Sequence, residues 1–202
     1  MHQTSSSKVI CLACSVLKRE IELLYENGDI NAEPFFLDST LHVKPEVLHA
    51  RMVESLDHYL SNGCRIILVY GDCHAYMADL EQNERIIRTS GINCCEILLG
   101  HDEYRKLRTE RAFLIMSEWA HRWKDVFHQT LGVSNKLLPD LMSNLHSKLV
   151  YLDTGITEIP QECLMEFSEA CGLTWHTVKV DLGFLRNSIN DAYAQLLGKV
   201  CR

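Results

Sequence analysis

Long hydrophobic runs and an excess of positive charge are both missing from this sequence. No apolar run approaches the roughly 20 residues that a transmembrane helix requires. Lys and Arg together number 20 against 27 Asp and Glu, so the net charge is −7 and phosphate backbones or anionic lipids are not generally attracted. Residues 1–7 are polar and lack the charged start and apolar stretch of a secretory signal. We therefore expect a cytoplasmic protein that binds neither nucleic acid nor membrane.

The common nucleotide and metalloprotease motifs are also absent. The chain contains no GxGxxG, no Walker loop and no HExxH, which removes the ordinary dinucleotide, nucleoside triphosphate and zincin functions. Cysteine, in contrast, is abundant, with nine residues in 202. An odd number without a secretion signal argues against a disulfide framework. In a reducing cell such thiols are buried hydrophobes, metal ligands or nucleophiles.

Short apolar runs rich in strand formers alternate with segments of helical periodicity, a pattern typical of parallel sheets with right-handed crossovers. The predicted fold is α/β, an open mostly parallel sheet with flanking helices over residues 1–202. Residues 1–103 and 104–202 are candidates for two similar Rossmann-like lobes. The sequence does not show the strand order. The pattern predicts strands at 8–13, 33–37, 65–70, 148–152 and 173–180, a helix or loop at 80–89, a strand turning into a helix at 92–99, and a mostly helical segment at 104–127.

Three cysteines fall where strands of the predicted sheet end. Cys14 follows the first strand, Cys73 follows the strongest one, and Cys95 lies in or just after the third apolar segment. Ligands of open parallel sheets collect at the carboxyl ends of the strands. We therefore expect these thiols to converge at one edge of the sheet. Packing in the core is the alternative for each of them, because cysteine is among the most buried residue types.

Further candidate ligands flank these thiols. The Cys11-x-x-Cys14 spacing suits chelation or redox chemistry, but Cys11 lies inside a strand and we expect it to be structural, because side chains alternate between faces. Cys94 neighbours Cys95, and the sequence leaves open which of the two is a ligand. His42, in a loop before a helix, is the first choice for a fourth ligand.

Three weaker candidates complete the set. His74 directly follows Cys73, and Glu20 lies on the helix after Cys14. Asp153 ends a strand of the second half in Asp153-Thr154-Gly155, where it would either bind a ligand or form an Asx turn.

The donor set leaves two metal centres open. Three cysteines with one histidine would make a closed tetrahedral zinc site. Three cysteines alone would leave an open coordination position on zinc or on a cluster iron. Zinc and an iron–sulfur cluster therefore remain alternatives, because the choice depends on geometry.

Several short motifs together resemble a known family over most of the chain. They are Ala13-Cys14-x-x-Leu17-x-x-Glu20-Ile21, Leu41-His42-x-x-Pro45-x-x-Leu48, Tyr70-Gly71-x-Cys73, Cys95-x-x-Leu98-Leu99-Gly100 with Tyr104, Trp119, and Leu152-Asp153-Thr154-Gly155. The chain resembles a domain-of-unknown-function family of anaerobes and methanogens, often encoded beside corrinoid-dependent methyltransferases. It departs from the family pattern at Cys94, where the family has Asp.

The resemblance implies a role near one-carbon or corrinoid metabolism, without a defined reaction. We therefore expect a cysteine-rich metal- or iron–sulfur-cluster-binding protein associated with corrinoid methyl transfer, and leave open whether it is an enzyme. A corrinoid is a further candidate ligand, and a corrinoid protein or methyltransferase a candidate partner. The alternatives are a non-catalytic corrinoid- or partner-binding module with structural cysteines, and a thiol redox sensor that uses Cys11 and Cys14.

Overall fold

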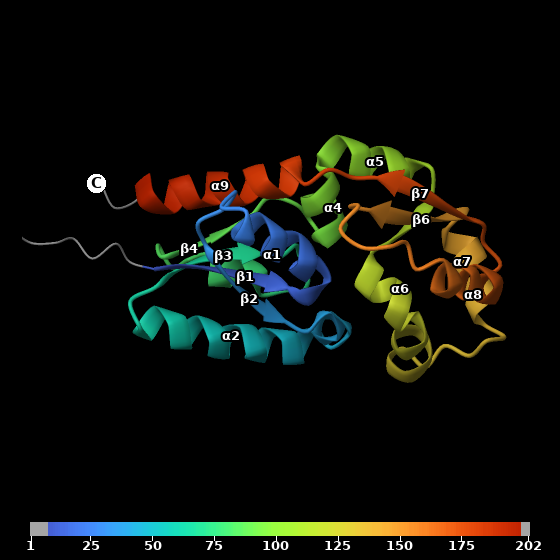
Figure 1. The fold of residues 1–202 in the computed structure, drawn as a ribbon. Helices are drawn as coiled ribbons and strands as arrows, with labels where there is room; N and C mark the ends of the chain where they lie inside the picture. Colours follow the sequence, from blue (N-terminus) through green and yellow to red (C-terminus); the bar gives the residue numbers. More distant parts are fainter. Residues whose placement is uncertain (1–7, 199–202) are drawn as a thin grey trace, which may run out of the picture. The chain divides into compact units, whose positions relative to one another are not determined.

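The structure is a computed structural model and describes residues 8–198. These residues form two parallel sheets with flanking helices (Figure 1). The α/β fold predicted from the sequence is confirmed. These residues form two compact units, one of residues 8–97 with 183–198 and one of residues 98–182. The lobes expected at 1–103 and 104–202 differ from these units chiefly because the closing helix returns to the first unit.

The first unit is built on a four-stranded parallel sheet in the order β2-β1-β3-β4. The two inner strands are buried almost throughout, which explains their continuous apolar sequences. The register pairs Ala13 of β1 with Val69 of β3 and Cys14 of β1 with Leu37 of β2. The strands are β1 (Val9–Cys14), β2 (Glu33–Leu37), β3 (Arg65–Val69) and β4 (Ile86–Arg88).

Helices cover both faces of this sheet. In Figure 1, α2 lies on one face, and α1 and α9 lie on the other. The α2 helix starts with Pro45, whose missing N–H costs nothing in a first turn. The core between α2 and the sheet includes Leu12, Leu68 and Met52. The helices are α1 (Lys18–Glu26), α2 (Pro45–Ser61), the short α3 (Met77–Leu80), α4 (Cys94–Leu99), which begins in this unit, and α9 (Gly183–Gly198); 3-10 turns η1 (Ser15–Leu17) and η2 (Ser39–Val43) follow β1 and β2.

The sequence misplaces one strand of this unit. β4 lies where a helix or loop was expected, and residues 92–99 contain the helix α4 but no strand. With only three residues, β4 is too short to show a period. It forms because Ile86 and Ile87 pair with Ile66 and Ile67 of β3.

The second unit has a three-stranded parallel sheet in the order β5-β6-β7. Its core is rich in aromatic rings, and Trp123 stacks on Phe167 with ring centroids 5.1 Å apart. The elements are α5 (His101–Thr109), β5 (Ala112–Ile115), α6 (Ser117–Lys124) continued by the π-helical turn η3 (Asp125–Thr130), α7 (Leu138–Leu145), β6 (Lys148–Asp153), α8 (Gln161–Cys171) and β7 (Trp175–Lys179).

The mostly helical segment predicted over 104–127 is wrong in its middle, where β5 lies between two helices. Arg111 separates α5 from β5 with a left-handed φ of 56°. Its guanidinium donates to the backbone carbonyls of Ser143 and Asn144, at 3.2 and 2.7 Å. Contacts distant in sequence thus support the break, and helical periodicity does not reveal them.

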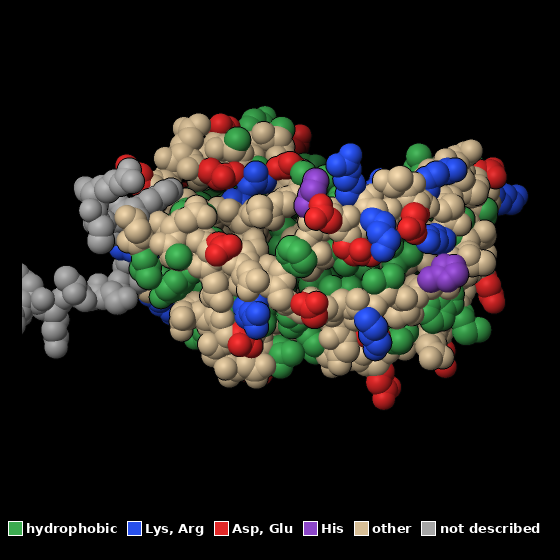
Figure 2. All heavy atoms as spheres, turned by 90° about the horizontal axis from the view of Figure 1, so that it is seen from above, with side chains coloured by type: hydrophobic (Ala, Val, Ile, Leu, Met, Phe, Trp, Pro, Cys, Tyr) green, Lys and Arg blue, Asp and Glu red, His purple; other side chains and the backbone are tan. Residues whose placement is uncertain are grey.

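Charges of both signs mix on one face of the molecule. On the described part of the face drawn in Figure 2, Lys and Arg side chains are interspersed with Asp and Glu. Within residues 8–198, no helix combines the length and the apolar character needed to cross a bilayer.

Candidate functional site

The strand order of the first unit has a topological switch point between β1 and β3. The chain leaves β1 for β2 on one side and then returns to β3 on the other, so the direction of winding reverses there. Ligands of open α/β sheets bind outside the carboxyl ends of the strands at such a switch point. Cys14 is the last residue of β1, and Cys73 lies in the connection that follows β3.

The structure brings three cysteine side chains together at this position. Cys14 is buried in the core between the sheet and α2, and Cys73 and Cys94 are partly buried against the same cluster. The Cys94 thiol donates a hydrogen bond to the sulfur of Cys14. All three are free thiols. We call Cys14, Cys73 and Cys94 the thiol site.

A close backbone contact places Cys73 beside the segment that carries Cys94. The Asp72 N–H donates to the Ile92 carbonyl at 2.9 Å. A Cβ atom on Gly71 would lie 2.2 Å from the same carbonyl oxygen, so this approach requires glycine. The loop after β3 is thereby joined to the residues that lead into α4.

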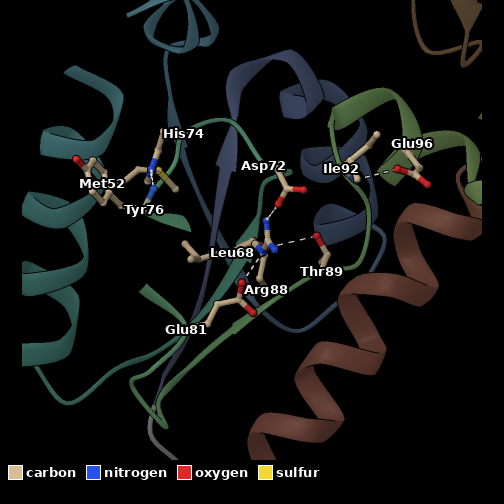
Figure 3. Close-up of polar contacts among 10 residues, drawn as sticks. All are labelled: Met52, Leu68, Asp72, His74, Tyr76, Glu81, Arg88, Thr89, Ile92 and Glu96. Atoms are coloured by element: carbon tan, nitrogen blue, oxygen red, sulfur yellow. Dashed lines mark hydrogen bonds and ion pairs between the residues drawn. The ribbon is translucent and has the colours of Figure 1, made fainter. Parts of the chain in front are cut away.

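Arg88 of β4 forms ion pairs with the same loop. The Arg88 guanidinium lies 2.6 Å from the Asp72 carboxylate and 2.7 Å from that of Glu81 (Figure 3). The Arg88 side chain is 19% exposed, but the Asp72 side chain is 60% exposed and that of Glu81 38%, so water and salt screen these ion pairs. They connect Asp72, the residue next to Cys73, to β4.

The start of α4 is fixed by reciprocal capping. The Asn93 side chain accepts from the Glu96 N–H at 3.0 Å. The Glu96 carboxylate in turn accepts from the Ile92 N–H at 2.8 Å (Figure 3). This pair of bonds resembles a capping box, except that the carboxylate accepts from the residue before the N-cap. It sets the first turn of α4, and with it the position of Cys94.

Two thiols of the site, Cys73 and Cys94, are neutral in the protein as it stands. Burial raises the pKa of Cys73 to about 11, although the Gly71 backbone N–H donates to its sulfur. The hydrogen bond to Cys14, together with burial, raises the pKa of Cys94 well above its usual value. Both groups are therefore protonated at neutral pH, and a bound cation would be needed to hold them as thiolates.

Tyr70 is a member of the site that the sequence did not single out, except as part of a motif. It follows β3 directly, is 1% exposed, and belongs to the same core cluster as Cys14. Burial and the charges that Cys14 and Cys94 would carry raise its pKa well above the usual value. Within residues 8–198 its buried hydroxyl has no hydrogen-bond partner. Its position at the end of a predicted strand is the sequence feature that could have indicated a place at the site.

Cys95 is next to Cys94 in the chain, and His42 lies in the turn that follows β2. Cys95 is partly buried beside Cys94 in α4, and its charge acts on Cys94 less than those of Cys14 and Cys73. His42 lies in η2, at the same carboxyl edge of the sheet, and its Nδ1 contacts the Ser39 carbonyl at 2.5 Å. Ligating histidines are commonly oriented by a bond of this kind.

Cys11 and Glu20 are both buried. Cys11 lies within β1, three residues before Cys14, so the two side chains point to opposite faces of the sheet. Its burial raises its pKa to about 12. Glu20 is in the first turn of α1.

His74 and Asp153 are engaged elsewhere. His74 Nε2 contacts Met52 Sδ of α2 at 3.4 Å, and its Nδ1 accepts from the Tyr76 N–H (Figure 3). Asp153 lies in the second unit, where it accepts from the Gly155 N–H at 2.8 Å and pairs with Lys179 at 2.6 Å. The bond from Gly155 forms the Asx turn that the sequence offered beside ligand binding.

The donor chemistry of the thiol site fits a soft metal. Thiolates select zinc, Cu(I) and iron–sulfur clusters, and the backbone donor to Cys73 is of the type found around metal-bound sulfur. Over residues 8–198, no group of three or more His, Cys, Asp or Glu side chains already stands in positions that hold a metal ion. Coordination would therefore require the sulfurs to move toward a common ion.

The fold and the site define an α/β protein with parallel sheets and a cysteine cluster at a switch point. The chain belongs to the family described as "Protein of unknown function (DUF1638)", whose profile matches residues 36–189. That range contains Cys73 and Cys94, whereas Cys14 precedes it.

Comparison with individual proteins adds little. No curated protein matches the chain. Among solved structures, the trehalose repressor from Escherichia coli is similar with a TM-score of 0.39 and 12% identity, over 96% of this chain and 95% of that chain. Similarity at this level supports no argument about function.

Proposed function

We propose that the chain is a metal- or iron–sulfur-cluster-binding protein whose ligands are the thiols of Cys14, Cys73 and Cys94. Cys95 and His42 are the candidates for a fourth ligand. One observation carries the proposal: three cysteines, at the end of β1, after β3 and after β4, gather at the switch point of a parallel sheet. Ligand binding is the usual use of that position.

The protonation of the thiols agrees with a site that is completed by a cation. A metal deprotonates the sulfurs that coordinate it, so the raised pKa values of Cys73 and Cys94 make binding release protons. Apparent metal affinity should therefore increase with pH. The backbone contact at Gly71 and the Arg88 ion pairs would keep Cys73 near Cys94 while the sulfurs move to coordinate the ion.

The fourth donor decides what the site can do. Histidine or a fourth cysteine would close a structural tetrahedron, whereas three thiolates alone leave a position for an incoming molecule. A zinc ion held in this way lowers the pKa of a coordinated thiol, and a cluster iron with an open position accepts a ligand or transfers electrons.

Corrinoid-dependent methyl transfer is the setting that we propose for this site. It is supported by the sequence resemblance alone, which also makes a corrinoid protein or methyltransferase the proposed partner. The alternative is a non-catalytic module that holds a corrinoid. In that case the cysteines are packed in the core and bind no metal.

Metal analysis of anaerobically purified protein tests the proposal. We expect either stoichiometric zinc, or iron with acid-labile sulfide and a brown colour. Cys14→Ser, Cys73→Ser and Cys94→Ser should each lower metal affinity by about tenfold or more. Cys163→Ser, a partly buried cysteine of the second unit, is the matched control and should keep the metal.

Two results would contradict the proposal. One is wild-type protein that neither contains metal nor takes up Zn²⁺ or iron and sulfide under anaerobic conditions. The other is a metal that all three serine variants keep. Normal folding of a metal-free protein after Cys14→Ala would favour the binding module instead.

A further inference from the structure

We propose that Tyr70 is a positioning residue of the thiol site, whose hydroxyl donates a hydrogen bond to a thiolate sulfur once a metal is bound. This inference rests on the proposed function and adds a donor that acts through the sulfur ligands. It begins from a buried polar group without a partner.

The Tyr70 hydroxyl is an exception to the usual pairing of buried polar groups. The residue is 1% exposed, and within residues 8–198 the hydroxyl meets no hydrogen-bond partner. Buried hydroxyls are nearly always paired, because an unpaired one loses its bond to water without replacement. Phenylalanine would fill the same space without that cost. The hydroxyl therefore points to a state of the site in which an acceptor is present.

The sheet register places this hydroxyl among the thiols. Ala13 pairs with Val69, so Cys14 and Tyr70 leave the neighbouring strands β1 and β3 side by side and on the same face. Both belong to the core cluster on the α2 side, against which Cys73 and Cys94 pack. The groups whose charges act on the Tyr70 hydroxyl are the three sulfurs that the proposed function assigns to the metal and, less strongly, the Asp38 carboxylate.

Metal binding would supply the missing acceptor. A neutral thiol is a weak acceptor, whereas an ionised group forms shorter and stronger hydrogen bonds. When the sulfurs lose their protons to coordinate a cation, the Tyr70 hydroxyl gains a charged acceptor in a buried setting. The bond would stabilise the metal-bound state over the metal-free one, and hydrogen bonds to ligating sulfur also tune the electronic properties of the centre.

Tyr70→Phe should therefore act in opposite directions on the two states. The metal-free variant should be as stable as the wild type or more stable, since an unpaired hydroxyl is removed. Its affinity for Zn²⁺, measured by competition with a chromophoric chelator, should fall by about tenfold to a hundredfold. With Co²⁺ as a probe, the sulfur-to-metal charge-transfer band should shift. Tyr25→Phe is the matched control, because Tyr25 is 39% exposed on α1, and it should change none of these quantities.

The outcomes separate this inference from the proposed function. Wild-type protein that binds neither Zn²⁺ nor Co²⁺ would overturn the proposed function itself. Wild-type protein that binds both, with a Tyr70→Phe variant of equal affinity and unchanged spectrum, would overturn only the role of Tyr70. A variant that is less stable without metal and unchanged in affinity would also overturn it, because that result shows a structural hydrogen bond.

Discussion

Cys11 and Cys14 show how the position of a cysteine in a strand separates core packing from a role at the site. Both lie in β1, but Cys11 is inside the strand with no exposed surface, whereas Cys14 is its last residue. Alternation along the strand predicts this difference from the sequence, since residues three apart face opposite sides. The Cys-x-x-Cys spacing alone would have suggested one chelating pair.

The substitution Cys11→Ser tests the structural role. A hydroxyl in that fully buried apolar position should lower the free energy of unfolding by about 1–3 kcal/mol, because it is more polar than a thiol. Metal content should stay unchanged. Urea unfolding and elemental analysis measure the two quantities. Cys11→Val, which keeps the position apolar, should cost less than Cys11→Ser, and loss of metal in both variants would contradict the assignment.

The choice between Cys94 and Cys95 could not be made from the sequence. Residues 92–99 were expected to change from strand to helix at an unknown point, and the direction of each side chain depends on that point. In the structure, the helix begins at Cys94, after Asn93 accepts from the Glu96 N–H and the Glu96 carboxylate accepts from the Ile92 N–H. The thiol that then bonds to Cys14 is Cys94.

At the scale of elements, the loop after β3 depends on a backbone contact that tolerates no side chain. Gly71→Ala would place a Cβ atom 2.2 Å from the Ile92 carbonyl oxygen. The atoms that it would meet belong to the backbone of Ile92 and Asn93, so no side chain can rotate away to make room. The loop must move away, and Cys73 moves with it. We expect a loss of about 1–3 kcal/mol in the free energy of unfolding, as for other overpacked sites, and weaker metal binding.

Denaturant unfolding and Zn²⁺ titration of the Gly71→Ala variant measure these effects. Gly198→Ala is the control, because a Cβ atom there meets nothing within 4 Å and the residue has no positive φ. Equal metal affinity in the Gly71→Ala variant and the wild type would show that Cys73 does not depend on this contact.

The strands that the sequence predicted are longer than those that it missed. β1, β3 and β6 are apolar runs of five or six residues, long enough to be recognised. β4 has three residues and β5 four, and β5 lies within a segment of helical periodicity. Both exist because partners distant in sequence pair with them. Local patterns do not contain that information.

At the scale of the whole molecule, the strand order determines which of the predicted ligands can meet. Strand ends identified Cys14 and Cys73, but only the order β2-β1-β3-β4 makes their strands neighbours at a switch point. The same order explains why α9, which is last in the chain, packs on β3 and β4 of the first unit. Assembly of the site therefore depends on long-range pairing that no motif encodes.

The neutral thiols also predict how the stability of the metal-free protein depends on pH. Folded Cys11 and Cys73 have pKa values of about 12 and about 11, both raised by burial, whereas an unfolded cysteine ionises near about pH 8.5. Between these values the folded state binds more protons than the unfolded state, so stability falls as pH rises. Each thiol contributes up to about 1.4 kcal/mol per pH unit to this slope.

We expect the free energy of unfolding of metal-free, reduced protein to be constant up to about pH 8.5 and to fall steadily toward about pH 11. Urea unfolding at a series of pH values, monitored by circular dichroism, measures the slope. The double variant Cys11→Val with Cys73→Ser should make the slope shallower, because neither new side chain ionises in this range, while Cys94, whose pKa is also raised, still contributes. A slope that the double variant leaves intact would mean that the buried thiols are not the groups whose ionisation destabilises the folded chain.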